Sequence, residues 1–194
     1  LLLSMPPNVI QVPNWLTLLA LLCCQSAAMA AGQVWSWANP LPQGNSLYGI
    51  SYGQQQYVAS GAQGTLLTSA DGITWQTQNS GNDLNLNDIT WNGEKYLAVG
   101  EKGLIITSLD GKSWYTQTTP IQQELNAVLW DGQRFIAIGN SGVVVSSQNG
   151  RHWQQHDSGS EHKLNDISQG KNSYVIVGDQ GLVMHSSSLK NWRI

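Results

Sequence analysis

The chain has 194 residues, a formal net charge of −3 and only 11% charged side chains. A nucleic-acid-binding protein needs a basic patch that displaces counterions from phosphates, but the nine Lys and Arg residues are scattered singly. The composition therefore excludes a nucleic-acid binder and disfavours attachment to an acidic membrane. The 20 Gly and nine Trp residues are typical of a turn-rich, all-β protein.

The first 30 residues differ from the rest of the chain. Residues 15–24 form an apolar run that is short for a bilayer span, and the small-x-small sequence Ala28-Met29-Ala30 follows it. This order predicts a signal peptide over 1–30 that is cleaved after Ala30, and hence an exported protein, periplasmic or extracellular. Because no Lys or Arg precedes the run, an uncleaved membrane anchor stays open as the alternative.

The two cysteines, Cys23 and Cys24, both lie in this first segment. Lipidation of either one is an alternative that the sequence does not settle. After cleavage the chain would contain no Cys, and therefore no disulfide and no thiolate metal site. The sequence predicts no cofactor.

A 39-residue repeat organises everything after residue 46. Four segments begin with Leu and end with Trp at one internal spacing, and successive copies are offset by 39 residues without insertion. The four predicted repeats are 47–85, 86–124, 125–163 and 164–194.

One repeat can be assigned to four strands. Residues 86–91 and 96–99 are apolar and β-rich on either side of an Asn-Gly turn. A Gly-x-x-Gly turn at 100–103 leads to a third strand over 104–107, and Asp110-Gly111 makes the hairpin to a fourth over 114–117. Four antiparallel strands in 39 residues match a propeller blade, which must stack on its neighbours to bury both faces. The fold class is therefore all-β, a propeller of four four-stranded antiparallel blades.

The segment before the first repeat, 31–46, reads as one further strand that could close a ring. The last repeat, however, already begins its own fourth strand at Trp192. Two alternatives stay open: a closed four-bladed ring, or part of a six- to eight-bladed ring that exposes a face and self-associates.

The hairpins between third and fourth strands resemble the Asp-box of BNR-repeat propellers, the superfamily that includes sialidases. The variant fourth hairpin, together with the pattern Val99-Gly100-Glu101-Lys102-Gly103, resembles the non-enzymatic, exported BNR-like propellers of bacteria. It is also similar, more distantly, to the photosystem II assembly factor propellers of cyanobacteria and plastids. The resemblance implies that Asp and Ser hold the hairpin turn and that Trp packs between blades. The residues concerned are Ser69, Asp71, Gly72, Trp75, Ser108, Asp110, Gly111, Trp114, Ser147, Asn149, Gly150, Trp153 and Trp192. In the fourth copy Ser188 and Leu189 replace Asp and Gly, and strain at Leu189 predicts a different turn there.

The residues argue against catalysis and metal binding. The arginines Arg134, Arg151 and Arg193 all lie near the Asp-box end, so they cannot form the sialidase-type cluster that the resemblance would place at the other end. Asp88 and Asp166 occupy equivalent positions, which a shared structural role explains better than a glycosidase pair. The histidines lack ligand spacing, so no metal site is predicted.

Recognition is predicted at the loops opposite the Asp-boxes. The dipeptide inside each Gly-x-x-Gly turn changes from copy to copy, as do the connections between blades. The candidate ligand-binding residues are Glu101, Lys102, Asn140, Asp179 and Gln180.

The sequence thus predicts an exported, non-catalytic binding or scaffold propeller that recognises a protein or a glycan. One alternative is a carbohydrate-active enzyme whose catalytic residues lie on further blades. Another is an assembly factor for a membrane protein complex, similar to the photosystem II propellers.

Overall fold

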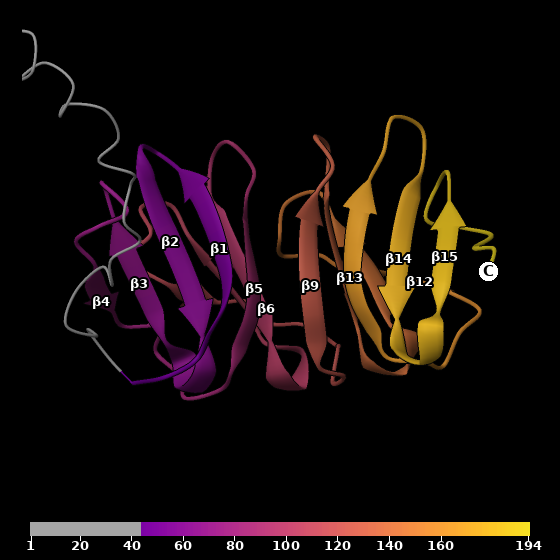
Figure 1. Ribbon diagram of the computed structural model, residues 1–194, viewed down its shortest axis with the longest axis horizontal. Coiled ribbons are helices and arrows are strands. Elements are labelled where there is room, and N and C mark those ends of the chain that lie inside the picture. Colours follow the sequence, from indigo (N-terminus) through magenta and orange to yellow (C-terminus); the bar gives the residue numbers. More distant parts are fainter. Residues whose placement is uncertain (1–43) are drawn as a thin grey trace, which may run out of the picture. The chain divides into compact units, whose positions relative to one another are not determined.

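The computed structural model describes residues 44–194, which belong to one compact unit. The predicted signal peptide and most of the segment 31–46 lie outside the described residues. Four antiparallel sheets follow one another in chain order, and we number them blades 1 to 4. Figure 1 shows them side by side from indigo to yellow.

Each blade is a meander in which successive strands pair, as predicted. Blade 1 holds β1 (Leu47–Gly53), β2 (Gln56–Gly61), β3 (Leu66–Ser69) and β4 (Gln76–Gln78). Blade 2 holds β5 (Leu86–Trp91), β6 (Tyr96–Gly100), β7 (Ile105–Ser108) and β8 (Tyr115–Thr116). Blade 3 holds β9 (Leu125–Trp130), β10 (Phe135–Gly139), β11 (Val144–Ser147) and β12 (Gln154–His156). Blade 4 holds β13 (Leu164–Gln169), β14 (Tyr174–Gly178) and β15 (Val183–Ser186).

The fourth blade departs from the four-stranded expectation. Its sheet has three strands, and the predicted fourth strand is reduced to one bridge between His185 and Arg193.

Short 3₁₀ turns join the second and third strands of every blade. They are η1 (Ala62–Gly64), η2 (Glu101–Gly103), η3 (Asn140–Gly142) and η4 (Asp179–Gly181). The third strand starts at this turn and ends at the hairpin that resembles an Asp-box, for which we keep the word Asp-box on that resemblance alone. The two features therefore lie at opposite ends of each blade. We call the end that carries η1–η4 the turn face.

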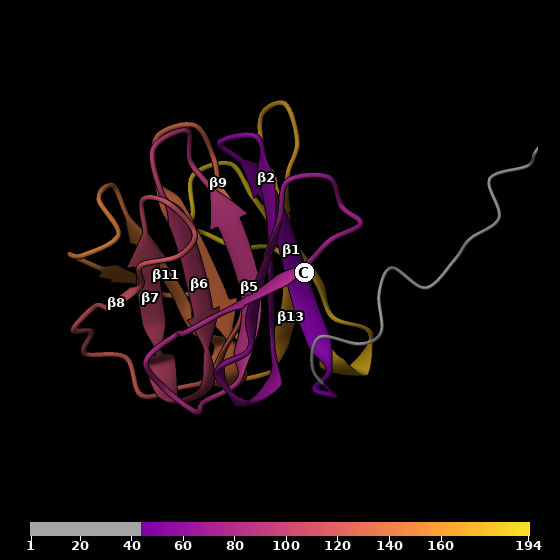
Figure 2. The ribbon, with the colours of Figure 1, turned by 90° about the vertical axis from the view of Figure 1, so that its left-hand side faces the viewer.

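The first strands of successive blades pack against one another: β1 on β5, β5 on β9, and β9 on β13. Figure 2 shows β1, β5 and β13 on one side of the unit, and β7, β8 and β11 on the other. The strands that make most of the contacts between blades therefore lie along one shared side.

The core consists of three seams between blades. The central seam packs Leu97, Val99 and Ile105 of blade 2 against Val128 and Phe135 of blade 3. The other two seams, between blades 1 and 2 and between blades 3 and 4, repeat this arrangement. Each interior blade thus has a forward face, which packs on the next blade, and a rear face, which packs on the preceding one.

Candidate functional site

The four turns of the turn face share one backbone geometry. The second residue of each dipeptide takes a left-handed conformation, with φ of 53° at Gln63, 54° at Lys102, 56° at Ser141 and 58° at Gln180. All four side chains are exposed. The turn therefore presents a different side chain from an invariant backbone in each blade.

The loops between blades are hydrogen-bonded to these turns and pack closely against them. The Gly64 amide donates to the Leu84 carbonyl at 2.8 Å, and the Gly142 amide donates to the His162 carbonyl at 2.8 Å. A Cβ added at Gly142 would lie 1.6 Å from the carbonyl oxygen of Ser160, so the second glycine of the motif is required by loop packing as well as by its positive φ. The interblade loops 79–85, 119–124 and 157–163 therefore belong to the turn face.

Three of the five predicted ligand-binding residues bond to asparagine side chains at or just before the first strand of their blades. The Glu101 carboxylate accepts from Asn85 Nδ2 at 2.6 Å, and Asn140 Oδ1 accepts from Asn126 Nδ2 at 3.0 Å. Asp179 Oδ1 likewise accepts from Asn165 Nδ2 at 2.9 Å. Lys102 and Gln180, by contrast, stand at exposed tips. The structure therefore separates two tip residues from three that also support the turn.

A polar network that the sequence analysis missed connects blades 2 and 3 at the turn face. Glu124 accepts from Asn87 Nδ2 at 2.9 Å and from Asn140 Nδ2 at 3.1 Å. Asn87 also donates to the Leu125 carbonyl at 2.9 Å, and Asn126 donates to the Leu164 carbonyl at 2.7 Å. The signal for this was present, because Asn87, Asn126 and Asn165 recur at the repeat interval.

The Asp-box side chains form their hydrogen bonds within their own hairpins. Asp71 accepts from the amides of Thr74 at 2.7 Å and Ile73 at 2.8 Å, and from the Ser69 hydroxyl. These bonds hold the pKa of Asp71 at about 2, and amide bonds from Ser113 and Lys112 hold the pKa of Asp110 at about 2 as well.

The remaining Asp-box residues follow the same plan. Asn149 Oδ1 accepts from the amides of Arg151 and His152, and the Ser108 and Ser147 hydroxyls accept from the amides of Gly111 and Gly150. The indoles of Trp75, Trp114 and Trp153 donate to the carbonyls of Gly72, Gly111 and Gly150. The geometry gives all these residues a structural role.

The fourth Asp-box corrects one expectation. Leu189 adopts φ 61°, close to the 71–74° of the glycines at the equivalent positions, so the backbone there does not avoid the left-handed region. The Leu189 side chain is fully buried in the core between blades 3 and 4, and this burial offsets the strain. The turn differs in its hydrogen bonding instead, since the Ser186 hydroxyl donates to the Lys190 carbonyl.

Asp88 bridges two blades. Its Oδ2 accepts from the Val128 amide of blade 3 at 2.8 Å, and its Oδ1 accepts from its own neighbour Ile89 at 2.8 Å. Burial raises the pKa of Asp88 to about 6, against the two amide bonds that lower it. Both carboxylate oxygens are thus engaged by backbone. The equivalent residue, Asp166, is exposed and accepts from Ile167 at 2.8 Å.

The basic and imidazole side chains do not converge. Arg134 forms an ion pair with Asp131 at 3.0 Å, and Tyr174 donates to the same carboxylate at 2.7 Å. Although burial raises the pKa of Asp131, the bonds from Tyr174, Gln133 and Arg134 outweigh it and leave that pKa below its ordinary value. His156 is buried against Ser146, whereas His152 lies 3.1 Å from Asn149. Among residues 44–194, no group of three His, Cys, Asp or Glu side chains could hold a metal ion.

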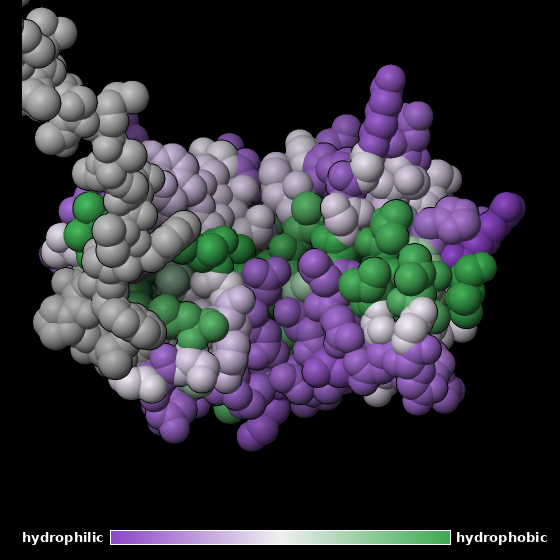
Figure 3. Space-filling model, in the orientation of Figure 1, coloured by the Kyte–Doolittle hydropathy of each residue, from purple (hydrophilic) through white to green (hydrophobic). Residues whose placement is uncertain are grey.

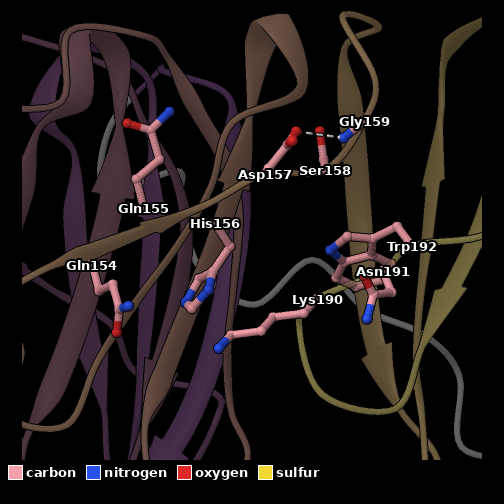
Figure 4. A pocket seen from close by; sticks show the side chains of 9 residues that line it. All are labelled: Gln154, Gln155, His156, Asp157, Ser158, Gly159, Lys190, Asn191 and Trp192. Carbon is pink, nitrogen blue, oxygen red and sulfur yellow. Dashed lines mark hydrogen bonds between the residues drawn. The ribbon is translucent and has the colours of Figure 1, made fainter.

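One hollow lies beside blade 4 and reaches the turn-face loop 157–163 at Asp157, Ser158 and Gly159. It has a volume of about 400 Å³ and lies between β12 and the last residues of the chain. Figure 4 shows Lys190 extending toward His156 on one side, with Asn191 and Trp192 on the other. The Trp192 indole N–H is buried and has no hydrogen-bond partner within the described part of the chain. Three further hollows lie beside Asp-boxes, and the predicted ligand-binding residues line none of these four hollows.

No helix within residues 44–194 is long and apolar enough to cross a membrane. No family model matches the chain, and no curated protein matches it.

Solved structures do match. The chain is similar to a structure described as "YCF48 bound to D1 peptide", with 19% sequence identity and a TM-score of 0.68 over 79% of this chain and 56% of that chain. YCF48 from Cyanidioschyzon merolae matches with 18% identity and a TM-score of 0.65, over 79% of this chain and 57% of that one. The WD40 β-propeller domain of Doa1 matches with 13% identity and a TM-score of 0.57, over 76% and 54%.

The chain therefore spans just over half the length of the YCF48 chains that it matches. Identities of this size show the fold alone. Together with the four observed sheets, they show that residues 44–194 form consecutive blades of a β-propeller.

Proposed function

We propose that this protein is a non-catalytic, exported propeller that binds a protein partner through its turn face. The observation that carries the proposal is the set of four tips, Gln63, Lys102, Ser141 and Gln180, which hold different exposed side chains on one backbone geometry. In a repeat protein, such variation on a constant scaffold is where binding specificity can change without disturbing the fold.

The chemistry of the turn face suits a polar protein segment better than a small apolar ligand. Acidic and basic groups alternate there, with Glu101 beside Lys102 and Glu161 near Lys163. None of the four tips lines the hollow that reaches this face at Asp157, Ser158 and Gly159, whereas the residues of a small-molecule site usually enclose their ligand. The likeness to YCF48, a protein whose structure is described with a bound D1 peptide, supports a protein segment as the class of ligand.

An assembly factor for a membrane complex is a specific form of this proposal. It rests on the same likeness, and it predicts that the partner is a subunit of such a complex. The carbohydrate-active alternative has no comparable support here, because the Asp88 oxygens are held by backbone amides.

The test uses glycine substitutions at the four tips. Because Gln63, Lys102, Ser141 and Gln180 all have positive φ, glycine removes each side chain without straining the turn. Partners captured from the exported fraction by the wild-type chain and by this variant would be compared by quantitative mass spectrometry. The matched control places glycine at four exposed positions of the Asp-box end: Ala70, Leu109, Gln148 and Ser187.

We expect a partner that the control retains and the tip variant loses. A partner retained equally by both variants would place recognition elsewhere. Binding to a glycan array that depends on the tips, without any captured protein, would contradict the proposed class of partner.

Export is proposed on the sequence alone and has its own test. The protein recovered from the exported fraction should begin at Ala31 when its N-terminus is sequenced. A chain recovered only with membranes, and beginning at residue 1, would contradict export with cleavage.

A further inference from the structure

The two end blades expose faces that are buried in every interior seam. On blade 4, Val175, Val177 and Val183 form the forward face and are 37%, 42% and 54% exposed. The equivalent residues of blade 3, Ile136, Ile138 and Val144, are fully buried. Figure 3 shows a hydrophobic patch over the β14 and β15 end of the molecule.

Blade 1 exposes the opposite kind of face. Its rear-face residues Leu47, Ile50 and Tyr57 are 48%, 61% and 36% exposed. Their equivalents in blades 2 to 4 are all buried in seams: Leu86, Leu125, Leu164, Ile89, Val128, Ile167, Tyr96, Phe135 and Tyr174. The four blades therefore do not close on one another, which excludes the closed four-bladed ring for the described residues.

The interior seams show which kind of surface packs against a forward face and which packs against a rear face. In each interior seam the forward face carries three aliphatic side chains, or two and Ser60 on blade 1. It always receives a rear face that carries a Leu, an Ile or Val, and an aromatic residue. The chain's own blade 1 carries that rear set in the same register, as Leu47, Ile50 and Tyr57. Forward and rear faces differ, so two forward faces cannot reproduce a seam.

The hydrogen bonds that join neighbouring blades also pair the forward face of blade 4 with the rear face of blade 1. In the interior, Asn126 donates to the Leu164 carbonyl and the Val128 amide donates to Asp88. Blade 4 carries the equivalent Asn165 and Asp166 at its exposed forward face. Blade 1 carries the equivalent Leu47 carbonyl and Ile50 amide at its rear face.

From this complementarity we infer that the forward face of blade 4 binds the rear face of blade 1 of a second copy of this chain. Asn165 donates to the Leu47 carbonyl of the second copy, and Asp166 accepts from its Ile50 amide. Two copies supply eight blades, which lies within the range of roughly four to eight that propellers adopt. The contact is head-to-tail, and closure needs both copies to use both faces.

The inference is tested by the mass of the purified chain in solution, measured by light scattering after size exclusion across a dilution series. Wild-type protein should have the mass of two chains and dissociate on dilution. Val177→Asp on the forward face and Ile50→Asp on the rear face should each raise the dissociation constant roughly 100-fold or more, because each buries a carboxylate in an apolar seam. Both positions are exposed in the single chain, so the fold tolerates the change, and circular dichroism checks this.

Leu109→Asp is the matched control. Leu109 is 65% exposed but belongs to an Asp-box hairpin rather than to either end face, so this variant should keep the wild-type mass. A finer probe is Asn165→Ala, which removes one cross-seam hydrogen bond and should weaken association roughly 2- to 12-fold.

Mixing the two face variants tests the direction of the contact. The Val177→Asp chain keeps its rear face and the Ile50→Asp chain keeps its forward face, so an equimolar mixture should recover a two-chain species with one intact seam. If only one variant loses association, the contact joins like faces and the inference is overturned. A monomeric wild-type chain at high concentration would also overturn it, and would assign both faces to blades of another chain or of a longer one.

Discussion

The interior seams and the two end faces present the same sequence positions in opposite environments. Phe135 is fully buried between blades 2 and 3, whereas its counterpart Tyr57 is 36% exposed on blade 1. A Cβ added at Gly142 would overlap the loop that follows its blade, whereas a Cβ added at Gly181 would have no atom within 4 Å. The comparison teaches that a residue of the repeat acquires its energetic role from the neighbouring blade, not from its own.

The largest contrast is expected at the aromatic position of the second strand. Phe135→Ala should lower the free energy of unfolding by about 3–5 kcal/mol, because it leaves a cavity in the central seam. Tyr57→Ala should cost about 1 kcal/mol or less in the monomer, since its ring is partly exposed. Urea unfolding at low protein concentration measures both, and equal losses would contradict the seam as the source of stability.

The second contrast concerns the last glycine of the turn motif. Gly142→Ala should destabilise the chain by about 3 kcal/mol, because it combines a positive-φ penalty with displacement of the Ser160 backbone. Gly181→Ala has the same kind of φ but open space, so it should cost about 1 kcal/mol. Thermal unfolding compares the two variants directly, and similar melting temperatures would show that loop packing contributes little.

The third contrast is in the pH dependence of stability. Asp88 has a folded pKa of about 6 against 3.8 when unfolded, so the folded state holds its proton more tightly. Its contribution to stability is full below pH 3.8 and is lost as the pH rises through 6, by up to about 3 kcal/mol. The advantage of wild type over Asp88→Asn should therefore shrink between pH 4 and pH 7.

Asp166→Asn is the control for this experiment. Asp166 lies at the exposed end face, and its charge is the smallest of the influences on the pKa of Asp88. This variant should therefore follow the wild-type pH profile closely when the chain is monomeric. Chemical unfolding at fixed pH steps measures both variants. Below pH 4 the loss of the Asp71 and Asp110 hydrogen bonds should destabilise all the variants alike. A difference between wild type and Asp88→Asn that does not vary with pH would contradict the raised pKa.

The smallest effect is expected at the exposed tips. Gln180→Gly should raise stability by about 0.5–1 kcal/mol, because glycine adopts the left-handed conformation without penalty. Asn172→Gly offers an exposed comparison whose φ is not positive, so it should not stabilise. A difference in melting temperature between these two variants measures the energetic cost of the left-handed backbone conformation at Gln180.

Much of the fold could be predicted because the repeat fixes its own register. The spacing from Leu86 to Trp114 places all four strands of blade 2, and the observed strands differ only at their ends. The exposure of Tyr57 could not be predicted, since nothing in the residue distinguishes it from the buried Tyr96. Burial at that position depends on a neighbouring blade that is present for one residue and absent for the other.

The candidate site was less accessible to sequence reasoning. Changing dipeptides between fixed glycines point to the turn face, but they do not reveal that Glu101, Asn140 and Asp179 also bond to asparagines behind them. Leu189 shows the reverse case. Its backbone preference predicts a different turn, yet burial of the side chain outweighs that preference, and only three-dimensional packing reveals this.

The seating of each interblade loop on the turn before it has an evolutionary consequence. Because the Gly142 amide binds the His162 carbonyl and the Gly64 amide binds the Leu84 carbonyl, each blade carries one half of the joint to its successor. A duplication or deletion of one whole 39-residue unit would preserve every such joint, whereas the gain or loss of a few residues would break one. Blade number can therefore change by gene duplication more readily than blade length, which agrees with four copies that contain no insertion.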